Sequence, residues 1–274
     1  MAKLEHDAAD HLGLTLFELM QRAGQASYEL ARAQWPLAQH WLILCGHGNN
    51  GGDGYVVARL AQAAGLHVTV LACSGNKPLP EEARLAQEAW LAAGGVIHAA
   101  EAAWPEQIDV IVDALLGTGI NRAPAAPYDY LIELTNAHAA PVLAIDMPSG
   151  LDAASGTTPG RAVIACHTLS MIAYKPGQLT GKARDYVGQL HCDALGLASW
   201  LAGQSQPISR FDAHDLSHWL KPRRATSHKG DHGRLLVIGG DSGTAGAIRM
   251  TGEAALRSGA GLVRVLTHED NIGP

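Results

Sequence analysis

The chain has 274 residues, of which 47% are hydrophobic and 17% are charged, and its formal net charge is −6. This length predicts one or two domains with enough apolar residues for a large core. The 20 basic and 26 acidic residues are well mixed, which argues against nucleic acid and against an anionic membrane surface as the main partner. No apolar run approaches the roughly 18 residues of a membrane-spanning helix, and the first residues lack the apolar core of a signal peptide.

The four cysteines show no C-x-x-C spacing, which argues against a zinc site and against a set of disulfides. They are Cys45, Cys73, Cys166 and Cys192. Three of them stand within or at the end of apolar runs that are typical of strands. We therefore expect buried free thiols and a reducing, cytoplasmic environment.

Apolar runs typical of strands alternate with amphipathic runs typical of helices. The expected helices cover residues 1–12, 16–35, 55–64, 80–93 and 128–138. The expected strands cover residues 41–45, 66–73, 96–98, 109–115, 141–147, 167–174 and 185–193. Thr15 and Glu18 have the spacing of a capping box at the start of the second helix. This alternation predicts the α/β class, with βαβ units and a mostly parallel sheet in a Rossmann-like three-layer sandwich.

The densest motif is the stretch GHGNNGGDG at residues 46–54, between an expected strand and an expected helix. Glycine allows close backbone approach, and the N-terminus of a helix offers free N–H groups that suit a phosphate. Asparagine and aspartate oxygens can bind ribose hydroxyls or a cation. The motif is neither G-x-G-x-x-G nor a P-loop. A plain strand-to-helix turn that happens to be rich in glycine is the alternative interpretation.

Two further loops, at residues 113–123 and 146–152, carry an acid where an apolar strand ends. The loops that follow parallel strands share one edge of the sheet, where such folds bind ligands. A buried aspartate there needs a cation, a donor or a ligand as partner, although a single one is often only a helix cap. Oxygen ligands without thiolates favour a hard cation. His47 is the one imidazole nearby, and a lone histidine is weak evidence of catalysis.

The later part of the chain is less regular. The loop 175–182 carries Lys175 and Lys182 and could bring a lysine near the cleft, but we expect a solvated loop lysine instead. Residues 199–228 form a polar connector, and its basic cluster at 221–224 lacks the interleaved aromatic residues of a nucleic-acid site. A strand at 234–240, a helix ending at Ser258 and a strand at 261–267 then form one βαβ unit. That unit is too small for a core of its own, so we expect a second domain that is cut off or that packs elsewhere.

Three motifs resemble those of the NAD(P)H-hydrate epimerases: GNNGGDG at 48–54, DALLGTG at 113–119 and IDMPSGLD at 145–152. Near the other end, HKGDHGR at 228–234 and RSGAGL at 257–262 resemble the start of the ribokinase-like, ADP- or ATP-dependent NAD(P)H-hydrate dehydratases. A chain that carries both sets of motifs in this order is similar to the bacterial bifunctional NAD(P)H-hydrate repair enzymes. The resemblance implies an epimerase domain over 1–210 and a truncated ribokinase-like second domain over 211–274. We expect that stub to be inactive, so that ADP or ATP serves only the missing half.

The resemblance also implies roles for single residues. The first group contacts the hydrated dinucleotide: Asn49, Asn50, Gly51, Gly52 and Asp53. A second group wraps its phosphates: Gly117, Thr118, Gly119, Ile120, Asn121, Arg122 and Ala123. Asp146 lies at the damaged nicotinamide ring. The implied potassium ligands are Asn50, Asp113 and Ser149.

The implied substrate is NADH or NADPH that carries water across a ring double bond, with the hydroxyl on C6. Inverting C6 requires a bond to that carbon to break and form again, by ring opening or by loss of water, and both routes need proton transfer. A carboxylate suits this task, and either Asp113 or Asp146 is the expected acid/base. We expect a homo-oligomeric isomerase that acts on a small molecule.

Two other classes of function remain as alternatives. The same fold can hold a nucleotide or a protein partner without turnover, although both aspartates are present. An NAD-dependent dehydrogenase is disfavoured, because the glycine fingerprint is absent and no acid follows the strand at 66–73 to bind a ribose.

Overall fold

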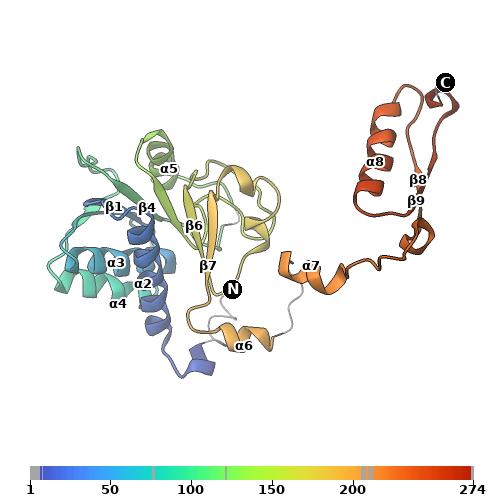
Figure 1. The fold of residues 1–274 in the computed structure, drawn as a ribbon. Helices are drawn as coiled ribbons and strands as arrows, with labels where there is room; N and C mark the ends of the chain where they lie inside the picture. Colours follow the sequence, from blue (N-terminus) through green and yellow to red (C-terminus); the bar gives the residue numbers. More distant parts are fainter. Residues whose placement is uncertain are drawn as a thin grey trace. The chain divides into compact units, whose positions relative to one another are not determined.

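The computed structural model describes residues 7, 9–75, 78–120, 122–204, 208, 211 and 213–272. The chain divides into two compact units, residues 1–205 and 206–274, which are described separately (Figure 1). The helix expected at 1–12 falls partly outside the described residues, and residues 7 and 9–12 within it are helical.

Unit 1 is built on a seven-stranded sheet in the order β3-β2-β1-β4-β5-β6-β7, and every neighbouring pair is parallel. The strands are β1 (His40–Cys45), β2 (His67–Ala72), β3 (Ile97–Ala99), β4 (Val110–Ala114), β5 (Val142–Ile145), β6 (His167–Met171) and β7 (Gln189–Asp193). The helices are α2 (Leu16–Gln34), α3 (Asn49–Ala63), α4 (Glu81–Ala92), α5 (Tyr128–Ala137) and α6 (Ala198–Ala202). The predicted α/β, Rossmann-like class is confirmed.

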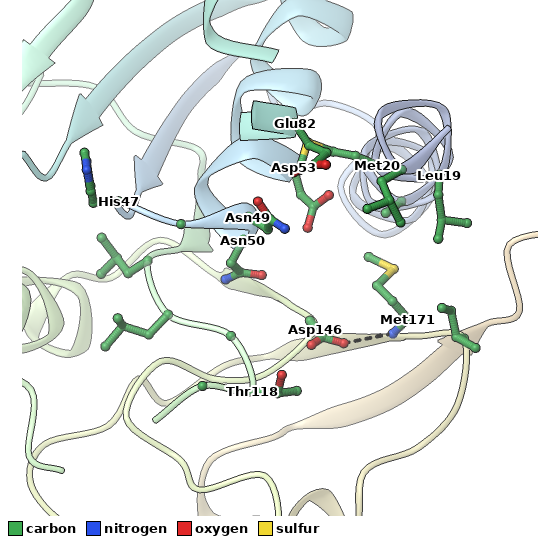
Figure 2. A pocket seen from close by; sticks show the side chains of 18 of the residues that line it. Leu19, Met20, His47, Asn49, Asn50, Asp53, Glu82, Thr118, Asp146 and Met171 are labelled. Carbon is green, nitrogen blue, oxygen red and sulfur yellow. Dashed lines mark hydrogen bonds between the residues drawn. The ribbon is translucent and has the colours of Figure 1, made fainter. Parts of the chain in front are cut away.

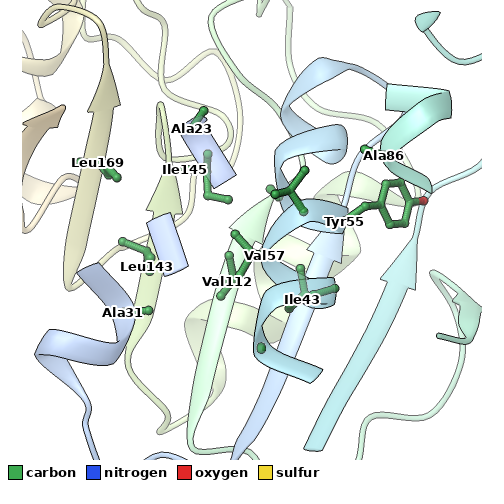
Figure 3. Close-up of a cluster of buried hydrophobic side chains, with 14 of the residues drawn as sticks. Ala23, Ala31, Ile43, Tyr55, Val57, Ala86, Val112, Leu143, Ile145 and Leu169 are labelled. Carbon is green, nitrogen blue, oxygen red and sulfur yellow. The ribbon is translucent and has the colours of Figure 1, made fainter. Parts of the chain in front are cut away.

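Helices cover both faces of this sheet (Figure 1). One face packs against α2, α3 and α4 through a large apolar cluster that contains Ile43, Val112 and Ile145 from the strands (Figure 3). The other face packs against α5 through Leu131 and Ile132. The strand order reverses between β1 and β4, so the loops after these strands diverge and leave room for a ligand.

Helix α2 begins where the sequence predicts. Thr15 accepts a hydrogen bond from the Glu18 N–H at 3.1 Å, and the Glu18 carboxylate accepts one from the Thr15 N–H at 2.8 Å. The capping box is therefore confirmed. Strand β6 ends at Met171 rather than at residue 174, because Ile172 has a positive φ of 66°.

The glycine-rich stretch differs from the prediction, because α3 begins at Asn49 and not at Tyr55. Its glycines lie inside the first turns of the helix and let it pack closely on its neighbours. A Cβ on Gly51 would stand 2.0 Å from the carbonyl oxygen of Gly46, and one on Gly54 would stand 2.7 Å from the Cβ of Ala114. These glycines thus set the distance between α3 and the strands.

The prediction for the cysteines is half right. Cys45 and Cys73 are buried, whereas Cys166 and Cys192 are exposed. Cys192 lies on β7, an edge strand of the sheet, and Cys166 lies in the loop just before β6. An apolar run at the edge of a sheet does not have the second covering layer that buries a central strand.

Unit 2 contains a parallel pair of strands, β8 (Arg234–Ile238) and β9 (Leu262–Leu266), joined through α8 (Ala245–Arg257). A shorter helix, α7 (Ala213–Trp219), precedes them. Most side chains of β8 are exposed, and Val237 is the buried one. Among the described residues of the whole chain, no helix is long and apolar enough to cross a membrane.

We predict that Gly51→Ala lowers the free energy of unfolding by about 2 kcal/mol or more, because its Cβ meets a backbone oxygen that cannot move aside. Gly119→Ala is the matched control. No heavy atom lies within 4 Å of the added Cβ, so a change within about 0.5 kcal/mol is expected. Urea denaturation of unit 1 measures both, and equal stabilities would refute this account of the glycines.

Candidate functional site

A cavity of about 410 Å³ opens at the carboxyl ends of β1, β4 and β5, at the point where the strand order reverses (Figure 2). One part of its wall is apolar and comes mainly from α2 and from the ends of β6 and β7. These residues are Leu16, Leu19, Met20, Ala23, Met171, Ile172 and Leu195. Polar residues also line the cavity, and Figure 2 shows Asp53 and Glu82 near Met20 and Asp146 next to Met171: they are Asn49, Asn50, Asp53, Glu82, Thr118 and Asp146.

A second cavity of about 620 Å³ adjoins the first and is formed by the loop between β4 and α5. The two cavities share Leu116, Gly117, Gly119 and Tyr128. The Tyr128 hydroxyl accepts a hydrogen bond from the His47 N–H at 3.0 Å, and this bond links the loop after β1 to the start of α5. Burial raises the pKa of the Tyr128 hydroxyl. The described surface thus offers two adjoining cavities, one with both apolar and polar walls and one formed by a single loop.

Most of the residues predicted to bind the substrate line these cavities. The first cavity is lined by Asn49, Asn50, Asp53, Gly117, Thr118, Gly119 and Asp146. The second is lined by Gly117, Gly119, Ile120, Arg122 and Ala123. Asn121 lies outside the described residues. Gly51 and Gly52 are buried in α3 and line neither cavity, because Gly51 packs on Gly46, and Gly52 packs on Met20 and Ala83.

Asp113 and Ser149 lie behind the cavity wall and are fully buried. Asp113 accepts hydrogen bonds from the Ser149 N–H at 2.8 Å, the Ser149 hydroxyl at 2.6 Å and the Leu115 N–H at 3.2 Å. Ser149 in turn accepts a hydrogen bond from the Leu116 N–H at 2.8 Å. Burial raises the pKa of Asp113 to about 6, against the opposing effect of these hydrogen bonds. The pair joins the loop after β4 to the loop after β5.

Asp146 follows β5 directly and has a positive φ of 63°. Its Oδ1 pairs with the Lys175 ammonium and accepts a hydrogen bond from the Met171 N–H at 3.2 Å (Figure 2). Gln178 donates to the Asp146 carbonyl oxygen at 2.6 Å. No described residue donates to Asp146 Oδ2. The side chain keeps 15% of its surface exposed and lies on the cavity wall.

The prediction of a solvated loop lysine at position 175 is wrong. Lys175 is 2% exposed, and besides Asp146 its Nζ contacts the Ser170 hydroxyl at 3.1 Å and the Met171 carbonyl oxygen at 2.9 Å. The positive φ of Ile172 turns the chain back after β6 and brings Lys175 under Asp146. The sequence signal was a lysine placed just after an apolar strand at the ligand-binding edge.

Sequence reasoning also missed Glu82 and the apolar face of α2 as parts of the wall. The sequence predicts only that Glu82 lies in the first turn of α4, where an acidic side chain stabilises the helix by interacting favourably with its dipole. The spacing of Leu16, Leu19 and Ala23 predicts a buried face, but it does not show that part of this face borders a cavity.

A parallel sheet whose cavity lies where the strand order reverses defines a Rossmann-like ligand-binding domain. The family model described as "YjeF-related protein N-terminus" matches residues 16–177, and the one described as "NAD(P)H-hydrate dehydratase" matches residues 235–274. The first covers more than half of the chain, which therefore belongs to the YjeF-related N-terminal family. The resemblance to NAD(P)H-hydrate repair enzymes is thereby confirmed.

Several curated proteins are similar over most of this chain. The bifunctional NAD(P)H-hydrate repair enzyme Nnr of Escherichia coli K12 is 67% identical over 98% of this chain and 52% of its own length. The repair enzyme of Leishmania braziliensis is 46% identical over 98% of this chain and 50% of its own length. The chain thus spans about half the length of the curated relatives it matches. Yeast ynu0 (YNL200c) shares the fold, with a TM-score of 0.56 and 23% identity over 69% of this chain and 85% of the yeast chain.

We predict that Ser149→Ala lowers the free energy of unfolding by about 2–3 kcal/mol in potassium-free buffer, because it leaves the buried Asp113 and the Leu116 N–H each short of a partner. Ser27→Ala is the matched control. Ser27 is equally buried, but its hydroxyl bonds only to the Ala23 carbonyl oxygen of its own helix, so a change within about 1 kcal/mol is expected. Chemical denaturation compares the two, and equal losses would contradict a connecting role for Ser149.

Proposed function

We propose that this chain interconverts the R and S epimers of hydrated NADH and NADPH. The observation that carries the proposal is the Asp146 carboxylate, which lies on the wall of the cavity where the strand order reverses. One of its oxygens is held by Lys175 and the Met171 N–H, and the other has no hydrogen-bond partner among the described residues. The names of the similar curated proteins supply the substrate class. The fold supplies a ligand site at the matching edge of the sheet.

Epimerisation at C6 needs a group that takes and returns a proton next to that carbon. We assign this role to Asp146 rather than to Asp113. Asp113 is fully buried, and both of its oxygens already accept hydrogen bonds from protein donors. Asp146 borders the cavity and retains an oxygen that can meet a substrate hydroxyl.

The charges in the two cavities favour one orientation of the dinucleotide. Asp53, Glu82 and Asp146 make the first cavity unfavourable for phosphates and suitable for the uncharged hydrated ring. The second cavity contains Arg122 and a glycine-bearing loop whose backbone N–H groups can approach phosphate oxygens. We therefore propose that the ring lies against Asp146 and the phosphates lie along residues 117–123.

The residues proposed to hold potassium are compatible with a cation. Asn50 lines the cavity, and its buried Nδ2 has no hydrogen-bond partner among the described residues, so a flipped amide would present its carbonyl oxygen there. Asp113 accepts three hydrogen bonds and retains one lone-pair site, and the Ser149 hydroxyl also retains one. Bound at Asn50, Asp113 and Ser149, potassium would offset negative charge and hold these loops together.

A binding module would keep the same site without turnover, and an activity assay distinguishes this alternative from the proposed epimerase.

The lack of ADP- or ATP-dependent dehydration by this chain stays a prediction, as do its cytoplasmic location and its homo-oligomeric state. Within the described part of unit 2, α8 packs on the two strands and most of β8 is exposed, which supports the prediction about dehydration.

We predict that Asp146→Asn reduces turnover by about 100-fold or more, because the amide cannot take up the proton. Asparagine tolerates the positive φ, and its Oδ1 can still accept from Lys175 and Met171, so the fold should persist. The measurement is conversion of purified R-hydrate of NADPH, followed by chiral separation, with circular dichroism as the folding control. Near-normal turnover in this variant would remove Asp146 from its role.

We also predict that turnover depends on potassium. Replacing KCl with NaCl at equal ionic strength should lower the rate, and KCl should raise the melting temperature of the substrate-free protein through binding to the folded state. Asn50→Ala should abolish that rise in melting temperature. Identical rates and melting temperatures in the two salts would refute a potassium site.

A further inference from the structure

The contacts of the Lys175 amine show how many hydrogen-bond acceptors surround it. Its Nζ faces three acceptors: Asp146 Oδ1, the Met171 carbonyl oxygen and the Ser170 hydroxyl oxygen. The Ser170 hydroxyl donates its own hydrogen to the Ala173 carbonyl oxygen at 2.7 Å, so towards Lys175 it can only accept. Three acceptors require three N–H donors, which an ammonium has and a neutral amine lacks.

The neighbourhood of the pair supports the same assignment. Asp53 and Glu82 face the same cavity as Asp146, and Cys192 on β7 interacts electrostatically with both Lys175 and Asp146. The attraction between an ammonium and a carboxylate is strongest at hydrogen-bonding distance, and Lys175 and Asp146 stand at that distance as an ion pair.

The carboxylate is also fixed in direction. The Lys175 ammonium and the Met171 backbone N–H hold Oδ1. The Gln178 side chain donates to the Asp146 backbone carbonyl oxygen and accepts from the Lys175 backbone N–H at 2.8 Å. This leaves Oδ2 as the oxygen without a described partner. An ionised, immobilised carboxylate with one available oxygen is equipped to remove a proton first, and it has no proton to give.

We propose that Lys175 is a positioning residue that keeps Asp146 ionised, so that epimerisation proceeds by ring opening and not by loss of water. This inference rests on the proposed epimerase function and specifies its route. Loss of water would require Asp146 to begin as an acid that protonates the departing hydroxyl. The ion pair with Lys175 opposes that starting state.

The ring-opening steps balance without any further reactant. Asp146 Oδ2 takes the proton of the C6 hydroxyl, the C6–O bond becomes a carbonyl, and the electron pair of the C6–N1 bond moves to N1. The Asp146 carboxyl then returns the proton to N1, which yields an open-chain aldehyde. Rotation about the C5–C6 bond presents the other face of the aldehyde. The reverse transfers close the ring with inverted C6, and the hydroxyl oxygen is the one the substrate brought.

The retained oxygen gives the test. The R-hydrate is converted in oxygen-18 water, and mass spectrometry of the separated S-hydrate counts solvent oxygen at C6, with a protein-free reaction as the background. We expect far fewer than one solvent oxygen per inversion with the unmodified chain. One solvent oxygen for every inversion would overturn the ring-opening route.

Variants separate positioning from structural support. Lys175→Met should lower kcat by about 100-fold with little change in KM, and its remaining inversions should carry more solvent oxygen, because a protonated Asp146 favours loss of water. Lys182→Met, an exposed lysine in the same loop region, should match the unmodified chain in both respects. An unchanged kcat in Lys175→Met, or a lower kcat with an unchanged count of solvent oxygen, would overturn the positioning role.

A measurement without turnover tests the ion pair itself. In protein labelled with nitrogen-15 lysine, the Nζ resonance of Lys175 is assigned by its loss in Lys175→Arg. We expect an ammonium signal at neutral pH, and a neutral amine would overturn the inference whether or not the chain is active. An ammonium signal together with no epimerisation by the unmodified chain would instead refute the proposed function and, with it, the route.

Discussion

Carboxylates buried at the ends of adjacent parallel strands are the constraint on which this site depends. A charged group without water is unstable unless the protein supplies donors or an opposite charge. Asp113 on β4 obtains its donors from Ser149 in the loop after β5, and Asp146 after β5 obtains its charge partner from Lys175 in the loop after β6. Each acid therefore connects its own loop to the next one, and the three loops are held as one surface.

The two aspartates look alike in sequence but differ in what they can do. Asp113 accepts hydrogen bonds on both oxygens and has no exposed surface, so its carboxylate supports the wall from behind. The Asp146 side chain accepts its hydrogen bonds on one oxygen only, and this side chain lines the cavity. The difference comes from position: Asp113 lies within its strand, whereas Asp146 lies just past the end of its strand with a positive φ.

Much of this arrangement was predictable from the sequence. Alternating apolar and amphipathic runs predicted the parallel sheet, and the spacing of Thr15 and Glu18 predicted the start of α2. The acids after the strands predicted the edge where the cavity lies. These signals are local, because they depend on periodicity, capping and strand ends.

The rest depended on contacts between segments far apart in sequence. The position of Lys175 just after an apolar strand places it near the ligand-binding edge, but the sequence does not show that the chain turns back at Ile172 and buries the amine under Asp146, 29 residues earlier. Likewise, Gly51 resembles a ligand-binding glycine until its contact with Gly46 is seen. Cys192 resembles a core residue until β7 is found at the edge of the sheet. In each case the partner decides the role, and the partner is set by tertiary packing.

The apolar wall gives the ion pair part of its strength. Leu16 and Leu19 reach the cavity because the capping box starts α2 at the correct residue, and Met171 and Ile172 continue the apolar surface on the other side. In the proposed epimerase, a substrate ring that fills the space between these walls would displace water from around Asp146. With less water, the attraction between Asp146 and Lys175 is less screened, and the hydrogen bonds to the Met171 N–H, the Met171 carbonyl oxygen and the Ser170 hydroxyl replace part of the hydration that the two charges lose.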